Sequence, residues 1–232
     1  MKPKVLTACA AICYLLGLPA FAASDAQHRT DWAQLGRYAS ANATLPAPTA
    51  HEKRVVFYGD SITDGWPLAK YFPGKPYINR GISGQTTPQM LVRFRQDVIN
   101  LHPNAVVILA GTNDLAQNTG EESLEQIIGY ITSICELAHA NKIKVVVASV
   151  LPVLSYPWRP GLQPATQVAA LNEQLRDYAR KNKLVYLDYY SAMVDSNLAM
   201  KPALSKDGVH PNAAGYAIMA PLAEKAIGKA LR

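Results

Sequence analysis

Five short apolar runs, separated by segments of helical spacing, constrain the fold of this chain more than any other feature. The runs are rich in β-branched and aromatic residues and lie at Val55 to Tyr58, Tyr77 to Ile78, Ala105 to Ala110, Val145 to Val150 and Leu184 to Leu187. The richest are apolar almost throughout, which is typical of strands buried on both faces. Because strands that alternate with helices form parallel sheets, the pattern predicts an α/β domain with helices on both sides of the sheet.

Helical spacing occurs in four segments, which begin near Thr87, after Glu121, near Val168 and after Pro211. Thr87 is expected to cap the first helix, because Pro88 suits the first helical position. Pro221 is expected to kink or break the last helix, because proline lacks the N–H group that a helix interior uses.

The N-terminal residues have the three parts of a secretory signal peptide. Lys2 and Lys4 precede an apolar run from Val5 to Leu18, and the small residues Ala20 and Ala22 follow. We expect cleavage after Ala22 and a secreted or periplasmic protein. The run is shorter than the roughly 20 residues of a membrane span, so no stable membrane anchor is expected.

A lipoprotein signal is the competing interpretation of this segment, since Leu6-Thr7-Ala8-Cys9 resembles a lipobox. The apolar stretch before Cys9 is too short to favour it. We therefore expect a signal peptide over residues 1–22, an N-terminal extension over 23–53 and one domain over 54–232. The extension is expected to hold a short helix around Asp31 to Ser40.

Charge and cysteine content narrow the possible functions. Loss of Lys2 and Lys4 lowers the 23 basic residues to 21 against 17 acidic ones, a formal net charge of +4 in place of +6. The basic residues are scattered, so no nucleic-acid interface is predicted.

Cys9 and Cys13 leave with the signal, so the mature chain cannot form an internal disulfide. Cys135 lies on an apolar helical stripe and is expected to pack in the core.

Three polar, glycine-bearing segments directly follow the first three runs. They are Gly59 to Thr63, Arg80 to Gly84 and Gly111 to Asp114. The carboxyl ends of parallel strands lie at one edge of the sheet, where the connecting loops open a crevice. The three segments are therefore expected to converge on one site.

Ser61 and His210 are the residues that suit nucleophilic catalysis. Hydrolysis of an ester needs a nucleophile, a base that takes its proton, and donors that stabilise the oxyanion. His210 is the candidate base for Ser61, because Asp207, three residues earlier, can reach the ring across a turn and fix its tautomer. The other histidines lie in the N-terminal extension or near helix ends, at His28, His51, His102 and His139.

The sequence at these places resembles the SGNH (GDSL-type) hydrolase superfamily. The similarity runs from about Arg54 to the C-terminus, and its blocks are Gly59 to Thr63, Asn79 to Gly84, Gly111 to Asp114 and Asp207 to His210. The resemblance implies a three-layer α/β/α sandwich with a five-stranded parallel sheet of flavodoxin-like type. It also implies a catalytic triad of Ser61, His210 and Asp207 that works without a metal or an organic cofactor.

The same resemblance implies an oxyanion hole made by the backbone N–H groups of Ser61 and Gly84 and by the side-chain amide of Asn113. Ile62 stands where leucine is usual in the family, and the change keeps an apolar side chain. Thr63 occupies the place of the second glycine in the Gly-x-Ser-x-Gly elbow, so the α/β-hydrolase fold is disfavoured.

Structural roles compete with catalytic ones at several positions. Ser61 taken alone could cap a helix. Gly81 is expected to serve a turn, and the loop after the fourth run either lines the substrate pocket or carries ordinary surface aromatics at Tyr156, Trp158 and Arg159. Structural hydrogen bonding or packing is expected for Asp60, Thr63, Asp114, Tyr189 and Tyr190.

The expected function is hydrolysis of a small-molecule or carbohydrate acyl ester through an acyl-enzyme. A lysophospholipase or lipase-type acylhydrolase is the close alternative. A metal-dependent phosphoesterase would instead collect Asp60, Asn113, Asp207 and His210 around a cation. A catalytically silent sugar-binding domain is the third class. The sequence leaves the acyl chain length, the alcohol portion and the oligomeric state open.

Overall fold

The computed structural model describes residues 31–232. The chain divides into the unit Met1–Trp32, of which only Asp31 and Trp32 are described, and the unit Ala33–Arg232. The second unit contains every helix and strand of the described residues. The predicted signal peptide and its cleavage after Ala22 lie outside the described residues.

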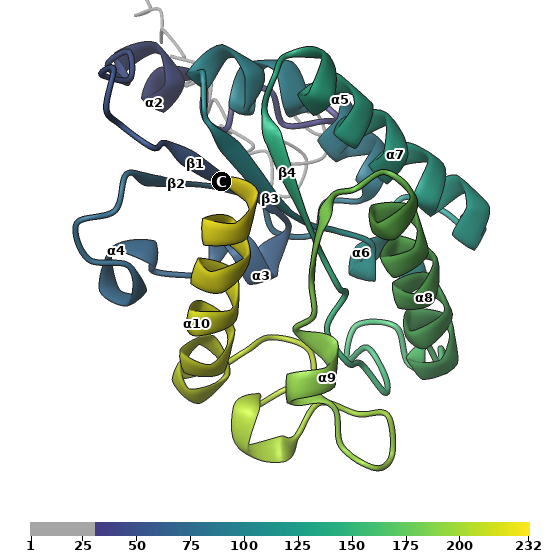
Figure 1. Ribbon diagram of the computed structural model, residues 1–232. Helices are drawn as coiled ribbons and strands as arrows, with labels where there is room; N and C mark the ends of the chain where they lie inside the picture. The colour runs from purple at the N-terminus through teal and green to yellow at the C-terminus, as the bar shows by residue number, and fades with distance from the viewer. Residues whose placement is uncertain (1–30) are drawn as a thin grey trace, which may run out of the picture. The chain divides into compact units, whose positions relative to one another are not determined.

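A five-stranded, all-parallel sheet forms the centre of this unit, in the order β2-β1-β3-β4-β5 (Figure 1). The strands are β1 Val55–Gly59, β2 Tyr77–Gly81, β3 Ala105–Leu109, β4 Lys144–Ala148 and β5 Val185–Leu187. Every residue of β1 and β3 is buried, as their apolar runs predicted. The expected α/β fold with a five-stranded parallel sheet is confirmed.

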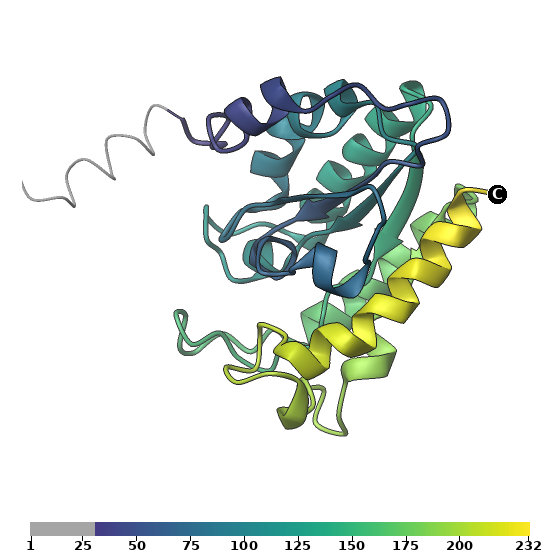
Figure 2. The same ribbon diagram turned by 90° about the vertical axis from the view of Figure 1, so that its left-hand side faces the viewer.

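Two layers of helices cover the two faces of the sheet (Figure 2). One layer packs on the face that carries Val56, Tyr58 and Val106, and consists of α5 Thr87–Asp97, α7 Leu124–Ala140 and α8 Ala165–Lys181. The other packs on Val55, Phe57 and Val107, and consists of α4 Leu68–Tyr71, α9 Tyr190–Met193 and α10 Ala213–Ala230. The remaining short elements are α2 Ala39–Thr44, α3 Ser61–Asp64, η1 Ile99–Leu101, α6 Thr112–Leu115 and η2 Pro202–Leu204.

The start of α5 differs by one residue from the sequence prediction. Thr86, not Thr87, is the N-cap, and its backbone N–H donates to Gln89 Oε1 at 3.0 Å in a capping box. Thr87 is the first helical residue, and its backbone N–H donates to Asp114 Oδ1 at 2.8 Å. The sequence prediction placed the cap at Thr87. The partner of Thr87 is Asp114, which lies 27 residues away, so the local sequence around Thr87 does not reveal that this residue is already inside the helix.

The last helix, α10, runs unbroken from Ala213 to Ala230 with Pro221 inside it. Of the two predicted outcomes, a break is therefore wrong, while a kink at Pro221 stays a prediction. Proline costs a helix interior about 3 kcal/mol, but Met219 and Ala223 on the same helix are fully buried against the sheet. A buried Met or Ile side chain contributes roughly 1.5–3 kcal/mol, so the buried Met219 and Ile227 of α10 together offset the cost of the proline.

The helix of the N-terminal extension also lies later than predicted. It spans Ala39–Thr44 rather than Asp31 to Ser40. Gln34 has a φ of 54°, a left-handed conformation that a right-handed helix cannot include. Turns therefore precede the helix, which begins only after Tyr38.

Cys135 packs in the core, as its place on the apolar stripe predicted. It is a free cysteine, 2% exposed, and burial raises the pKa of its thiol to about 12. Among the described residues, no helix has the length and apolar character that crossing a bilayer requires.

Candidate active site

The sheet register brings the first three predicted segments together. Gly59, the last residue of β1, is aligned with Gly81 of β2 and Leu109 of β3, so the loops that follow these strands start at one edge (Figure 1). The close approach of α3 to these strand ends requires glycine at both Gly59 and Gly81. A Cβ atom on Gly59 would lie 2.2 Å from Thr63 Oγ1, and one on Gly81 would lie 2.1 Å from the backbone nitrogen of Asp64. Both glycines therefore let α3 pack directly on the strand ends.

Ser61 is the first residue of α3, and it does not cap that helix. The N-cap is Asp60, whose Oδ1 accepts the N–H of Ile62 at 3.0 Å. Burial raises the pKa of Asp60 to about 7, while the Ile62 hydrogen bond lowers it. Asp60 thus has the structural hydrogen bond expected of it, and the Ser61 hydroxyl is left for another partner.

That partner is His210, which stands 149 residues later in the chain. Ser61 Oγ lies 2.9 Å from His210 Nε2, and His210 Nδ1 lies 2.6 Å from Asp207 Oδ2. The other carboxylate oxygen, Asp207 Oδ1, accepts the backbone N–H groups of His210 at 2.8 Å and of Val209 at 3.0 Å. Gly208, with a φ of 80°, gives the turn the left-handed residue that it needs.

These hydrogen bonds keep Asp207 charged. Partial burial alone would raise the pKa of Asp207, but the hydrogen bonds from the His210 ring and from the His210 and Val209 backbone outweigh it and hold the pKa of this carboxyl well below its usual range. A carboxylate opposite Nδ1 favours the tautomer in which Nε2 accepts a proton, and it stabilises the imidazolium that results. The arrangement can therefore draw a proton from Ser61.

Of the three residues expected to form the oxyanion hole, Ser61 follows β1, Gly84 follows β2 and Asn113 follows β3. Gly84 has a φ of 80° and leads into α5, and Asn113 is a buried residue of α6. Asn113 Nδ2 donates to the carbonyl oxygen of Gln85 at 3.0 Å. Because an amide nitrogen carries two hydrogens, this bond uses only one of the two Nδ2 hydrogens of Asn113.

Asp114, next to Asn113, has the structural role that was expected. Its Oδ1 accepts both the backbone N–H and the hydroxyl of Thr87. Burial raises the pKa of Asp114 to about 6, although the Thr87 hydrogen bonds act to lower it. This carboxyl therefore ties α6 to the start of α5.

Known proteins with this pattern identify the family. Residues 57–218 match the model of the GDSL-like Lipase/Acylhydrolase family. The chain belongs to this family. The structure of a GDSL-like lipase from Bacteroides thetaiotaomicron superimposes with a TM-score of 0.84 at 50% sequence identity, over 86% of this chain and 100% of that one. Such acylhydrolases are hydrolases that act on ester bonds.

Curated relatives are more distant. An acetylxylan esterase from Geobacillus stearothermophilus is 24% identical over 211 residues, 76% of this chain and 94% of that protein. Platelet-activating factor acetylhydrolase IB subunit alpha2 of Homo sapiens is 29% identical over 185 residues, 75% of this chain and 76% of that protein. The chain spans only about half, 49%, of an uncharacterized lipoprotein YqeF of Bacillus subtilis, with 27% identity over 119 residues.

The loop after β4 reaches the active edge of this GDSL-like protein. Trp158 is 41% exposed, and its ring centroid lies 6.0 Å from that of His210. Tyr156 is buried beneath it, 5.2 Å away between centroids, and its hydroxyl donates to the carbonyl oxygen of Thr112 at 2.8 Å. Arg159 donates to the Gln117 carbonyl oxygen at 3.0 Å. The loop therefore lies beside His210, and its role in lining a substrate pocket stays a prediction.

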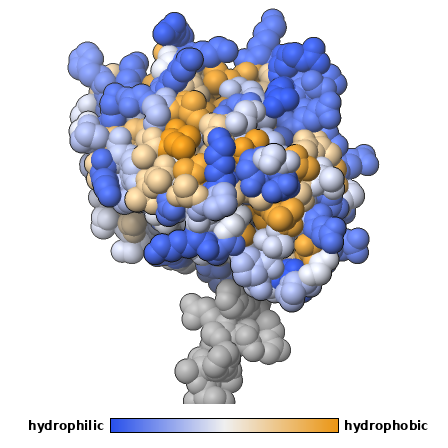
Figure 3. Space-filling model, turned by 90° about the horizontal axis from the view of Figure 1, so that it is seen from below, coloured by the Kyte–Doolittle hydropathy of each residue, from blue (hydrophilic) through white to orange (hydrophobic). Residues whose placement is uncertain are grey.

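The face that carries these loops is partly apolar. Figure 3 views the molecule from the side on which α9 lies and shows apolar residues gathered near the middle, with hydrophilic residues around them. Leu154 and Trp158, two of the exposed large apolar residues, belong to the loop after β4. Tyr189, by contrast, is 1% exposed and packs in the core as expected.

Sequence reasoning missed Arg93, a fully buried residue of α5. Its guanidinium donates to the carbonyl oxygens of Gly59 and Arg80, each at 2.9 Å, and pairs with Asp97 at 3.1 Å. It also lies over the Tyr58 ring at 4.3 Å. Arg93 thus holds the ends of β1 and β2 together beneath the loop that carries Ser61. The spacing of Arg93 and Asp97 was a weak signal, because such pairs are usually on a helix surface.

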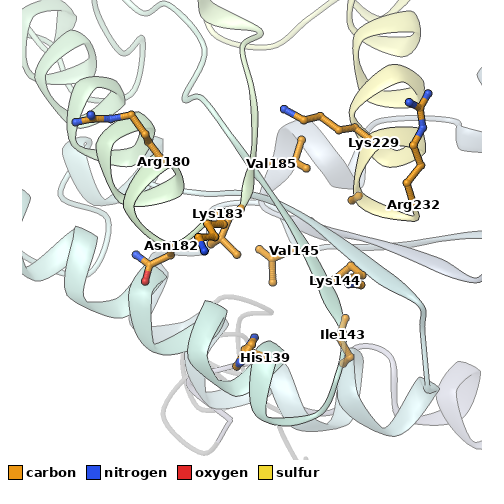
Figure 4. Close-up of a pocket in the computed structure, with 12 residues that line it drawn as sticks. His139, Ile143, Lys144, Val145, Arg180, Asn182, Lys183, Val185, Lys229 and Arg232 are labelled. Carbon is orange, nitrogen blue, oxygen red and sulfur yellow. The ribbon is translucent and has the colours of Figure 1, made fainter.

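A cavity of about 630 Å³ lies at the opposite edge of the sheet, where β4 and β5 begin (Figure 4). Its charged lining is basic and includes Arg180, Lys183, Lys229 and Arg232. Arg180 and Lys229 stand in the last turns of α8 and α10. Basic side chains are favoured there because helix C-termini carry partial negative charge. The helix ends account for this charge without an anionic ligand.

Proposed function

We propose that this GDSL-like protein hydrolyses carboxylic esters through an acyl-enzyme, with Ser61 as nucleophile, His210 as base and Asp207 as the group that orients the base. The observation that carries the proposal is the continuous hydrogen-bond chain, 2.9 Å from Ser61 Oγ to His210 Nε2 and 2.6 Å from His210 Nδ1 to Asp207 Oδ2. Both distances lie within ordinary hydrogen-bonding range, so His210 can take the Ser61 proton while Asp207 remains a carboxylate that orients the ring.

The proposed reaction has two halves. His210 Nε2 takes the hydroxyl proton while Ser61 Oγ attacks the carbonyl carbon, and the oxyanion is held by the N–H groups of Ser61 and Gly84 and by the Asn113 amide. His210 then gives its proton to the leaving alcohol, and an acyl-serine remains. Water repeats the sequence against the acyl-serine, which releases the acid and restores Ser61.

Short acyl esters, O-acetyl esters of carbohydrates above all, are the proposed substrates. Two curated relatives support this choice, because the names acetylxylan esterase and platelet-activating factor acetylhydrolase both specify an acetyl group. The exposed Leu154 and Trp158 favour a second candidate, a lysophospholipase-type acylhydrolase, since a lipid chain could cover them.

A metal-dependent phosphoesterase is less well supported by the geometry. Its four proposed ligands would have to converge on one cation. Asp207 instead contacts Nδ1 of the His210 ring, while Ser61 contacts Nε2. The ring therefore separates Asp207 from the segment that carries Asp60.

We further propose export. The proposed signal peptide spans residues 1–22, the extension 23–53 and the catalytic domain 54–232. The order of charged, apolar and small residues before Ala22 supports the signal. N-terminal sequencing of protein recovered from the periplasm or medium should begin at Ala23, and recovery of the intact precursor alone would contradict the proposal.

Turnover of p-nitrophenyl acetate tests the assignment of the nucleophile. Ser61→Ala should lower kcat by more than about 10⁴-fold, because the triad acts as a unit. Ser133→Ala, which removes a hydroxyl from the exposed side of α7, is the matched control and should leave kcat unchanged. Wild-type turnover by Ser61→Ala would rule the mechanism out.

A further inference from the structure

Asn118, outside all four family blocks, contacts both loops that supply the oxyanion donors. Its Nδ2 donates to the carbonyl oxygen of Gly84 at 3.1 Å and to Asn113 Oδ1 at 3.0 Å. Its backbone N–H donates to the Asn113 carbonyl oxygen, also at 3.0 Å. The two hydrogens of one amide thus restrain both Gly84 and Asn113.

The remaining polar atom of Asn118 faces Trp158. Asn118 Oδ1 accepts the indole N–H of Trp158 at 3.1 Å. Every hydrogen-bonding group of this side chain is therefore engaged, two with the oxyanion loops and one with the exposed aromatic. A shift of the indole would move the amide, and a shift of the amide would move the groups that face the oxyanion.

Trp158 lies beside the imidazole that protonates the leaving alcohol in the proposed reaction. In the proposed reaction His210 Nε2 protonates the leaving oxygen, so the alcohol is next to the imidazole. Trp158 is the exposed aromatic beside that imidazole, with ring centroids 6.0 Å apart and planes 35° apart. Tyr156 supports the indole from below, which fixes the ring before substrate arrives.

We propose that Trp158 binds the alcohol portion of the substrate as a stacking surface for a neutral sugar ring, and that Asn118 is a positioning residue that couples this contact to the oxyanion hole. The proposal rests on the proposed function. A sugar ring fits because it presents an apolar C–H face to an aromatic plane.

The test compares two acetyl esters that differ only in the alcohol, ethyl acetate and an O-acetylated methyl xyloside. Trp158→Ala should raise KM for the xyloside about 10-fold, the scale of one well-placed aromatic contact, and leave KM for ethyl acetate within about twofold. Trp158→Phe keeps the ring and should retain the xyloside KM. A KM change that is equal for both esters, or absent for both, would overturn the sugar-stacking role.

The coupling between Trp158 and the oxyanion hole through Asn118 is tested separately, by measuring kcat. Asn118→Ala should lower kcat for both esters by about 10- to 100-fold at unchanged KM, less than the roughly 100- to 1000-fold loss of a whole donor. Trp158→Phe removes the indole N–H and should lower kcat about threefold. That loss should vanish in the Asn118→Ala background, because it acts through the same amide. Additive losses, or an Asn118→Ala effect on KM alone, would overturn the coupling.

Two controls separate this inference from the proposed function and from misfolding. Val92→Ala, at an exposed apolar position of α5, should behave like the wild type on both esters, and each variant is checked by thermal unfolding. If the wild type hydrolyses neither ester, the proposed function fails. If it hydrolyses both and the Trp158 variants leave their ratio unchanged, only this inference fails.

Discussion

At the scale of single residues, the site depends on which polar groups hydrogen-bond to the backbone and which are left to contact other side chains. Asp60 takes the helix cap, so Ser61 faces His210, and Asp207 uses one oxygen for the backbone and the other for the ring. The sequence predicted these pairings because Asp207 and His210 are close in the chain and because the four blocks resemble those of the SGNH hydrolases. Asn118 escaped notice because its partners Gly84 and Trp158 are 34 and 40 residues away.

Asp207→Asn should leave the site assembled and stop it working. An asparagine can still contact the ring, but its amide favours the tautomer that cannot accept the Ser61 proton. We expect kcat for p-nitrophenyl acetate to fall by about 10³- to 10⁴-fold, with KM changed by less than about threefold. Asparagine has no ionisable group that a higher pH could convert into the missing carboxylate, so raising the pH should not restore activity to the variant. Recovery at high pH would contradict this account.

The pKa of Asp60 makes stability depend on pH. Because burial raises it to about 7, the folded protein keeps a proton that the unfolded chain loses above about pH 4. The contribution of Asp60 to the free energy of unfolding is therefore greatest below about pH 4, and it is lost as the pH rises to about 7. Asp60→Asn keeps an oxygen for the Ile62 N–H but does not titrate. Its free energy of unfolding, relative to that of the wild type, should therefore rise by about 2 kcal/mol as the pH goes from 5 to 8.

Urea unfolding at the two pH values measures that gain. Asp114, whose pKa burial raises to about 6, titrates in both proteins, and its charge acts to raise the pKa of Asp60, so the difference between the proteins reports Asp60 together with this coupling. An identical pH dependence in the two proteins would show that Asp60 is ionised throughout.

At the scale of elements, the apolar patterns predicted the strands well, and the helix ends less well. Strands such as β1 and β3 are buried on both faces, so composition alone reveals them. The cap of α5, the position of α2 and the continuity of α10 depend instead on contacts made in three dimensions. The same holds for Arg93, which a helical pattern places on a surface but which the fold buries.

Arg93→Met should destabilise the protein by about 3–5 kcal/mol, because it leaves the Asp97 carboxylate buried without its cation. Arg95→Met, at an exposed position of the same helix, is the matched control and should change the free energy of unfolding by less than about 0.5 kcal/mol. Urea unfolding compares the two variants. Adding Asp97→Leu to Arg93→Met should recover part of the loss, and equal effects of the two single changes would contradict a structural role for Arg93.

At the scale of the whole molecule, one parallel sheet brings together residues that are far apart in the chain, such as Ser61 and His210, which are 149 positions apart. The alternation of strands and helices was sufficient to predict this sheet, and the sheet in turn predicted the edge at which the loops meet. The identity of the substrate does not follow from the same logic, because loops such as the one that carries Trp158 have no periodic pattern. Contacts between loops could be found only in the structure.

The central claim is that Ser61 becomes covalently acylated during turnover. Intact-mass and peptide mass spectrometry after treatment with a serine-directed organophosphorus reagent tests it most directly, since the adduct persists where the acyl-enzyme does not. We predict a single adduct on the peptide that contains Ser61, none in Ser61→Ala and greatly slowed labelling in His210→Ala. Labelling of another serine, or equal labelling of Ser61→Ala, would contradict the account.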